Sequence, residues 1–471
     1  MISTVIKNDW QQWWRDVNVR ASLMVLLLIS GVALWHQLDF QSSLAATRRH
    51  AQEESRDEWL KQDVKHPHVA AHFGNYAYKK PSILHCFDPG LTIYTGSSVY
   101  MEPHRQNDFL FSKGQESDTG IRFGWLSPGM ICQIIMPLFI ILLSFNSING
   151  EVQRGTMPLL LTQGLSFRRL LLAKTLAVFL LLEGLLTLYM AISCVTAILF
   201  VDTVFELPTI IYLWFVYTIY ILCWSLVTVY ISARTKVVGS AISILLLVWM
   251  FTCVLAPRIS ANIAENIYAL PTNYEFKKQI AGDIEKGLNG HDTQSERAKR
   301  IEAELLAKYQ VDSVQKLPFN FEGYMMQQGE EYSSKVYDVH FASIFQALKD
   351  QKTVQSFFAS ISPYMALRNI SMAASNASLE SEIDFQLQAE AYRRNFVQLL
   401  NNDMMNKSAY GSFNTYRVEK GTYAAIDDLE VKSRPLSWWF PHVIIENVLI
   451  LGWTLTMTML VLFTSRKVIY R

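Results

Sequence analysis

Residues 150–174 read GEVQRGTMPLLLTQGLSFRRLLLAK and separate two long apolar runs of the chain. The stretch carries four cations and one carboxylate. Short loops that are rich in Lys and Arg stay on the cytoplasmic side of a membrane. The stretch therefore predicts a cytoplasmic loop, and it fixes the expected orientation of every other segment.

The middle of this loop predicts a short amphipathic helix. Thr156 is suited to begin a helix, and Pro158 falls in the first turn, where a missing N–H costs nothing. The helix should break at Gly164. Its apolar side chains recur at helical spacing: Met157, Leu160, Leu161 and Leu165. An apolar face on such a loop predicts a binding partner, and the alternative is a helix that lies on the membrane surface.

The order of residues in this loop resembles the coupling loop of permeases in the type-2 ABC exporter superfamily. Glu151 is followed by Gly155-Thr156, a Leu-rich turn, and a basic exit that ends at Lys174. The resemblance implies that the loop docks into a cleft on a separate cytosolic ABC ATPase, which would hold ATP and Mg²⁺. The coupling contacts would centre on Glu151, Arg154, Gly155, Thr156, Met157, Leu160, Arg168 and Lys174.

Further stretches resemble a bacterial subfamily of these permeases, which has a large extracytoplasmic domain between spans five and six. They are Pro257-Arg258, residues 362–369 (SPYMALRN) and residues 389–393 (AEAYR). This subfamily is similar to permeases implicated in the maturation of multicopper enzymes. The resemblance implies a multi-pass protein of the bacterial inner membrane with both termini in the cytoplasm. It also implies a second permease copy or a homologous permease as partner.

Composition independently indicates a membrane protein. Of 471 residues, 51% are hydrophobic and only 18% are charged, which is too apolar for an ordinary soluble chain. A net charge of +1 without a clustered basic face argues against a nucleic-acid partner. Among the five cysteines only Cys86 lies in a polar segment, so no disulfide framework is expected.

The predicted fold class is an all-α polytopic membrane protein with six transmembrane helices and a large, mostly helical extracytoplasmic domain. The later part of its first extracytoplasmic segment reads as irregular, and residues 415–434 are a candidate strand pair. In chain order the segments are an interfacial helix (1–20), span one (21–38), a first extracytoplasmic segment (39–127), span two (128–146), the cytoplasmic coupling loop (147–169), span three (170–200), span four (208–231), span five (237–256), the extracytoplasmic domain (257–437), span six (438–464) and a cytoplasmic tail (465–471).

No nucleotide-binding or hydrolytic motif occurs in the sequence. Gly-x-x-x-x-Gly-Lys-Ser/Thr, His-Glu-x-x-His and Gly-x-Ser-x-Gly are all missing. The chain is therefore not expected to be an enzyme or to carry a cofactor of its own. ATP hydrolysis is expected from the partner subunit.

Three polar residues fall inside apolar runs: Glu183 in span three, and Glu446 with Asn447 in span six. Polar groups at that depth are costly and usually face a bundle interior or a wet cavity. They are candidates for gating or substrate contact. The alternatives are hydrogen-bonded packing and an interface with a second permease.

No metal site is predicted, although six histidines gather between residues 50 and 104. His68 and His72 are spaced to share one helical face. Together with His85 and Cys86 they offer imidazole and thiolate ligands that suit copper or zinc. The competing interpretation is that these histidines are structural.

Taken together, the sequence predicts the permease subunit of a bacterial ABC exporter, driven by a separate cytosolic ATPase. The alternative is a mechanotransmission or maturation complex. In that case ATP hydrolysis would act on a periplasmic partner through the extracytoplasmic domain, without moving a solute.

Overall fold

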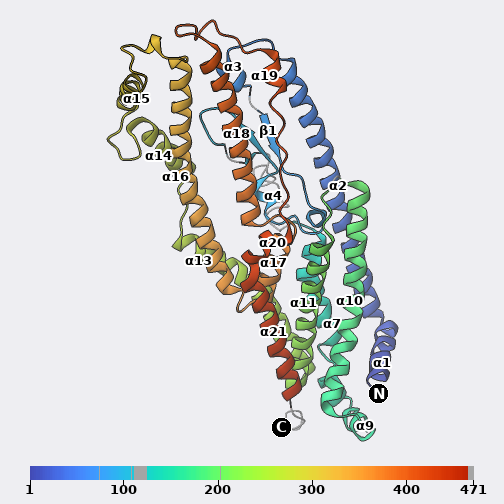
Figure 1. Ribbon diagram of the computed structural model, residues 1–471. Helices are drawn as coiled ribbons and strands as arrows, with labels where there is room; N and C mark the ends of the chain where they lie inside the picture. Colours follow the sequence, from blue (N-terminus) through green and yellow to red (C-terminus); the bar gives the residue numbers. More distant parts are fainter. Residues whose placement is uncertain (74, 108, 111–124, 202, 465–471) are drawn as a thin grey trace.

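Long helices run along the molecule in the computed structural model, which describes residues 1–73, 75–107, 109–110, 125–201 and 203–464 (Figure 1). The N-terminus, α9 (Met157–Thr162) and the end of α21 (Ile444–Phe463) lie at one end. The helices α14 (Asn273–Lys286) and α15 (Gln294–Tyr309) lie at the other. The predicted tail, 465–471, and residues 111–124 of the first extracytoplasmic segment are outside the described residues.

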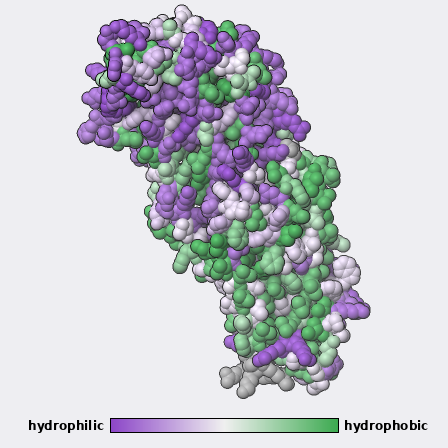
Figure 2. Space-filling view, in the orientation of Figure 1, coloured by the Kyte–Doolittle hydropathy of each residue, from purple (hydrophilic) through white to green (hydrophobic). Residues whose placement is uncertain are grey.

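Six helical segments are long and apolar enough to span a membrane, which confirms the predicted all-α polytopic class. On the face that Figure 2 shows, hydrophobic residues predominate over the half of the molecule that these spans form, and hydrophilic residues predominate over the other half. We call the latter the polar half; it consists of the described residues within 39–127 and 268–435. Spans one to six are Val17–Lys61 (α2), Pro128–Gln153 (α6 to α8), Phe167–Phe200 (α10), Leu207–Arg234 (α11), Val238–Ile267 (α12 to α13) and Leu436–Phe463 (α20 to α21).

The first span is much longer than the sequence predicted. Helix α2 has 45 residues and joins the predicted span to the helical stretch that follows it. At 1.5 Å per residue it is about 68 Å long, roughly twice the 30 Å of a hydrocarbon core. The helix therefore continues into the polar half. It is separated from α1 (Ile2–Arg15) by Asp16, whose carboxylate accepts a hydrogen bond from the Asn18 N–H at 2.8 Å.

Spans two and five each contain a widened turn next to a proline. The turns are η2 (Ile131–Ile135) before Pro137 and η3 (Phe251–Leu255) before Pro257. Proline has no N–H to donate to the preceding turn, so carbonyls there need other donors. The Gln133 carbonyl accepts from Tyr220 Oη at 2.7 Å, and the Thr252 carbonyl accepts from Ser362 Oγ at 2.7 Å.

The polar half is mostly helical but holds a small sheet that the sequence analysis missed. Strands β1 (Asn75–Tyr78), β2 (Ser98–Met101) and β3 (Phe109–Leu110) are antiparallel in the order β1-β2-β3. The prediction of an irregular segment there was wrong, because strands this short leave little alternating pattern. The candidate strand pair at 415–434 is also wrong, since that stretch contains helix α19 (Lys420–Ala424) and no strand.

Two long helices, α16 (Phe321–Phe358) and α18 (Leu379–Lys407), organise the polar half. Helix α16 packs against α13 (Ala256–Ile267) and α18, and α17 (Pro363–Ala374) is buried in the outer end of the span bundle. Trp59 near the end of α2 closes a separate core, where its Nε1 donates to the Tyr423 carbonyl at 3.0 Å. The remaining elements are α3 (Pro67–Ala71), η1 (Ile83–Cys86), α4 (Thr92–Thr95), η4 (Val314–Lys316) and η5 (Phe440–Val443).

Candidate functional site

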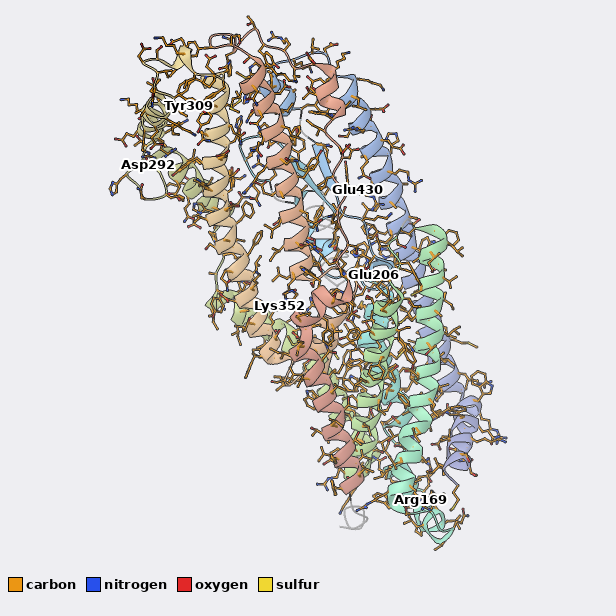
Figure 3. The ribbon with its side chains drawn as sticks, in the orientation of Figure 1. Arg169, Glu206, Asp292, Tyr309, Lys352 and Glu430 are labelled. Carbon is orange, nitrogen blue, oxygen red and sulfur yellow. The ribbon has the colours of Figure 1, made fainter. Side chains whose placement is uncertain are left out.

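The loop between spans two and three forms a tip at the end of the molecule that holds the N-terminus (Figure 1). It contains α8 (Asn149–Gln153) and α9, separated by Gly155 with a φ of +74°. The predicted amphipathic helix corresponds to α9, which begins after Thr156 and ends before Gly164 with a φ of +86°. Arg169 lies at this tip, whereas Asp292 and Tyr309 lie at the far end of the polar half (Figure 3).

The predicted coupling residues divide into an exposed set and a buried set. Arg154, Gly155 and Arg168 are at the surface. So is Leu159, which is 59% exposed and was not among the predicted coupling residues. Leu160 and Thr156 are half-buried. In contrast, Glu151, Met157 and Lys174 lie inside, with Met157 only 1% and Lys174 only 6% exposed.

A buried ion-pair network explains why Glu151 and Lys174 are inside. Lys174 Nζ lies 2.7 Å from Asp9 Oδ1 and 3.1 Å from Glu151 Oε1. The other oxygen of Glu151 accepts a hydrogen bond from Thr156 Oγ1, and Arg154 lies 3.4 Å from Oε1. Helices α1, α8 and α10 are thus joined at one ammonium group. Sequence reasoning missed Asp9, because no local signal connects it with a lysine 165 positions away.

The same loop is fixed to the end of span four. Ser232 Oγ accepts from the Ile148 N–H at 3.0 Å, and Asn149 Nδ2 donates to Thr235 Oγ1 at 3.1 Å. Trp10 Nε1 of α1 donates to the Ala177 carbonyl of α10 at 2.8 Å. The tip is therefore braced by two spans and the first helix, while one side of α9 stays free.

At the opposite end of the spans, four buried polar groups meet in what we call the Asp88 node: Asp88, Gln133, Tyr217 and Ser371. Gln133 Nε2 donates to Asp88 Oδ2 at 2.9 Å and to Tyr217 Oη at 2.7 Å. Ser371 Oγ donates to the same Asp88 oxygen and lies 3.0 Å from Tyr217 Oη. The node connects the first polar segment, span two, span four and α17.

Glu446 and Asn447 occupy a second junction, which we call the Glu446 node. The Glu446 side chain is 2% exposed and accepts from Ser356 Oγ of α16 at 2.7 Å and from Asn369 Nδ2 of α17 at 3.0 Å. Asn447 Oδ1 accepts from Tyr212 Oη of span four at 2.6 Å. Glu446 thus joins span six to α16 and α17, and Asn447 joins span six to span four.

Glu183 lies apart from both nodes. Its Oε1 accepts from Thr218 Oγ1 at 3.0 Å and from Thr187 Oγ1 at 3.2 Å, so it joins span three to span four. Its Oε2 is buried and has no hydrogen-bond partner among the described residues. The three predicted intramembrane polar residues are therefore not one site.

The structure splits the histidine and cysteine candidates. His68 and His72 approach each other and are joined by His104, which the sequence analysis did not single out. His85 and Cys86 are buried on η1, which packs against spans one and three. Burial raises the pKa of the Cys86 thiol to about 12. Burial, followed by the neighbouring His104 and His72, lowers the pKa of His68 to about 4.

The fold and these junctions define a six-span, all-α membrane protein whose polar half is anchored to the spans by buried hydrogen bonds. Residues 273–430 match the family described as "Domain of unknown function (DUF3526)". The match runs from α14 through α19 and so lies within the polar half. No curated protein matches the chain significantly.

Removing the buried ammonium group tests the ion-pair network. Lys174→Met leaves the carboxylates of Asp9 and Glu151 buried without their shared cation, so we expect it to cost about 3–5 kcal/mol of stability. The control is Lys7→Met on the exposed side of α1, which should change stability little. Thermal unfolding of the detergent-solubilised chain measures both. Equal unfolding midpoints for the two variants would contradict a stabilising role for the ion-pair network of Lys174.

Proposed function

We propose that this chain is the membrane-spanning permease subunit of an ABC exporter in the bacterial inner membrane, with both termini in the cytoplasm. A separate cytosolic ATPase that binds ATP and Mg²⁺ would power it. The observation that carries this proposal is the tip between spans two and three. The apolar face expected from the sequence (Met157, Leu160, Leu161 and Leu165) packs against the hydrophobic core. The tip instead exposes Pro158 and Leu159 of α9, beside Thr162, Gln163 and exposed cations, while α1, α10 and α11 brace its other side.

The structure revises which residues we expect to contact the ATPase. We propose that Leu159 is the apolar anchor and that Pro158, Gln163, Arg154 and Arg168 surround it, since all five are exposed. A few side chains near the centre of an interface commonly carry most of the binding energy, and Arg is prominent among them. Glu151, Met157 and Lys174 would act indirectly, by holding α9 against α1 and span three.

The ion pairs and hydrogen bonds that hold the tip would transmit a movement of the docked ATPase to the spans. A force applied to α9 reaches α1 and span three through Lys174, and span four through Ser232 and Thr235. The spans would then rearrange together when the ATPase closes. A second permease copy, or a homologous permease, and the lipid bilayer would share the apolar faces that spans one, three, five and six leave uncovered.

A second candidate function is force transmission to a periplasmic partner without solute transport. The Asp88 and Glu446 nodes favour it, because span four bonds directly to α17, span six bonds directly to α16 and α17, and span two bonds to Asp88 of the first polar segment. The 45-residue helix α2 also continues unbroken from the span bundle into the polar half. A movement that starts at the tip could therefore reach the polar half as a displacement of whole helices.

Changing Leu159 to Asp should prevent docking. Placing a carboxylate at the centre of an apolar contact costs at least about 2 kcal/mol, which corresponds to roughly a 30-fold loss of affinity. The measurement is the amount of ATPase that co-purifies with the chain in mild detergent, together with its rate of ATP turnover. Val69→Asp is the matched control, because Val69 is also an exposed apolar residue (53%) but belongs to the polar half. Equal ATPase recovery with Leu159→Asp and wild type would contradict the proposed docking surface.

Native cysteines distinguish export from force transmission. Cys132 of span two and Cys223 of span four are fully buried in the span bundle. Export requires a passage between the spans, so alkylation of these thiols in the complex should accelerate during ATP turnover. Force transmission through a sealed bundle leaves both protected, whether or not ATP is hydrolysed. Mass spectrometry of the alkylated chain separates the two outcomes, with the half-buried Cys194 as an internal reference.

A further inference from the structure

Three imidazole rings gather where α3 faces the turn that follows β2. His68 and His72 are one helical turn apart, and their Nε2 atoms are separated by 3.1 Å. The centroid of the His104 ring lies 4.9 Å from that of His68 and 5.1 Å from that of His72. One ring nitrogen from each residue falls within 4.8 Å of the other two.

These separations suit a small divalent ion. Zinc is bound by imidazole nitrogens at about 2.0–2.1 Å, which places the nitrogens of a tetrahedral site about 3.4 Å apart. The His68 and His72 pair already has nearly this spacing. Small rotations of the His104 ring would complete the set. Imidazole is a preferred ligand of zinc and copper, and neither ion requires a thiolate or carboxylate in addition.

A carboxylate orients the third ring. Glu330 of α16 is buried; one of its oxygens contacts His104 Nδ1, and the other accepts from the His104 backbone N–H at 3.1 Å. A carboxylate that holds Nδ1–H leaves Nε2 as the free nitrogen, which is the usual arrangement behind a metal-binding histidine. The contact therefore fixes which nitrogen is available to a ligand.

The backbone at His104 is also held in an uncommon conformation. Its φ is +71°, in the left-handed region that few residues other than glycine adopt. The strain is offset by the two contacts with Glu330 and by Ser333 Oγ, which donates to the His104 carbonyl at 2.9 Å. Residues held in such conformations concentrate at ligand-binding and active sites. Three contacts from α16 thus hold His104 against α3.

We propose that His68, His72 and His104 bind one divalent d-block ion, Zn²⁺ or Cu²⁺, with Glu330 as the positioning residue. His72 and His104 are exposed, so the fourth coordination position faces solvent and is open to water or an exchangeable ligand. The bound ion would connect α3 to the turn after β2, and through Glu330 to α16. The site is independent of the proposed ATPase docking, because it depends only on residues of the polar half.

Metal titration of the full chain tests the site. The chain is purified without a histidine tag, stripped with EDTA, and titrated separately with Zn²⁺ and Cu²⁺ by isothermal calorimetry in detergent. We expect one ion per chain for at least one of the two metals. Replacing any of the three histidines by Ala should weaken binding at least 10-fold. The control is His50→Ala, an exposed histidine beside Glu54 that should leave binding unchanged.

Glu330→Gln separates positioning from general folding. It should weaken binding by about 10-fold or more, as loss of the carboxylate behind a metal-bound histidine commonly does. It should also change the visible spectrum of the Co²⁺-loaded chain while the unfolding midpoint in EDTA stays near that of wild type. An unchanged affinity and spectrum would remove Glu330 from the proposal.

Chemical protection provides a test that needs no variant. Diethyl pyrocarbonate modifies accessible imidazoles, and the sites are identified by mass spectrometry. Saturating Zn²⁺ or Cu²⁺ should protect His68, His72 and His104 in the wild-type chain but leave His50 reactive. Failure of both metals to bind stoichiometrically, or equal modification of the three rings with and without metal, would overturn the site. The 3.1 Å contact would then be a hydrogen bond between two neutral imidazoles.

Discussion

A buried polar group near a hydrocarbon layer has to find its partner inside the protein, and that constraint organises this chain. Asp88 carries a carboxylate into the outer end of the span bundle, where Gln133 and Ser371 satisfy it. Those two side chains belong to span two and α17, which are far apart in the sequence. Without this contact the first polar segment, the spans and the α16 to α18 region would lose the hydrogen bonds that join them at this point.

The same requirement that buried polar groups be paired inside the protein holds at the tip and at the Glu446 node. Lys174 is stable in its buried position because Asp9 and Glu151 surround it, and these contacts hold the tip against α1 and span three. Glu446 connects span six to α16 and α17 in the same manner. Each junction replaces contact with water by contact between helices. The tip, the spans and the polar half are consequently linked by hydrogen bonds as well as by the packing of apolar side chains.

Hydropathy alone was sufficient to predict the six spans, because each is a long apolar run with charged flanks. The helix in the tip was also predictable, since Thr156, Pro158 and Gly164 are local signals of its start and end. Contacts between residues far apart in the sequence were not predictable. Nothing near Asp9 indicates its ion pair with Lys174, and nothing near His72 indicates that His104, rather than Cys86, lies beside it. The continuous α2 was missed because the change from apolar to polar residues suggested a boundary that the backbone does not have.

Single-cysteine labelling in intact cells tests most directly whether the tip and the polar half lie on opposite sides of the membrane. Gln163→Cys at the exposed end of α9 and Ser295→Cys on exposed α15 are made in a chain whose five native cysteines are replaced. We expect a membrane-impermeant maleimide to label Ser295→Cys in intact cells and Gln163→Cys only after the inner membrane is opened. Labelling of both positions in intact cells would contradict a cytoplasmic tip, and with it docking to a cytosolic ATPase.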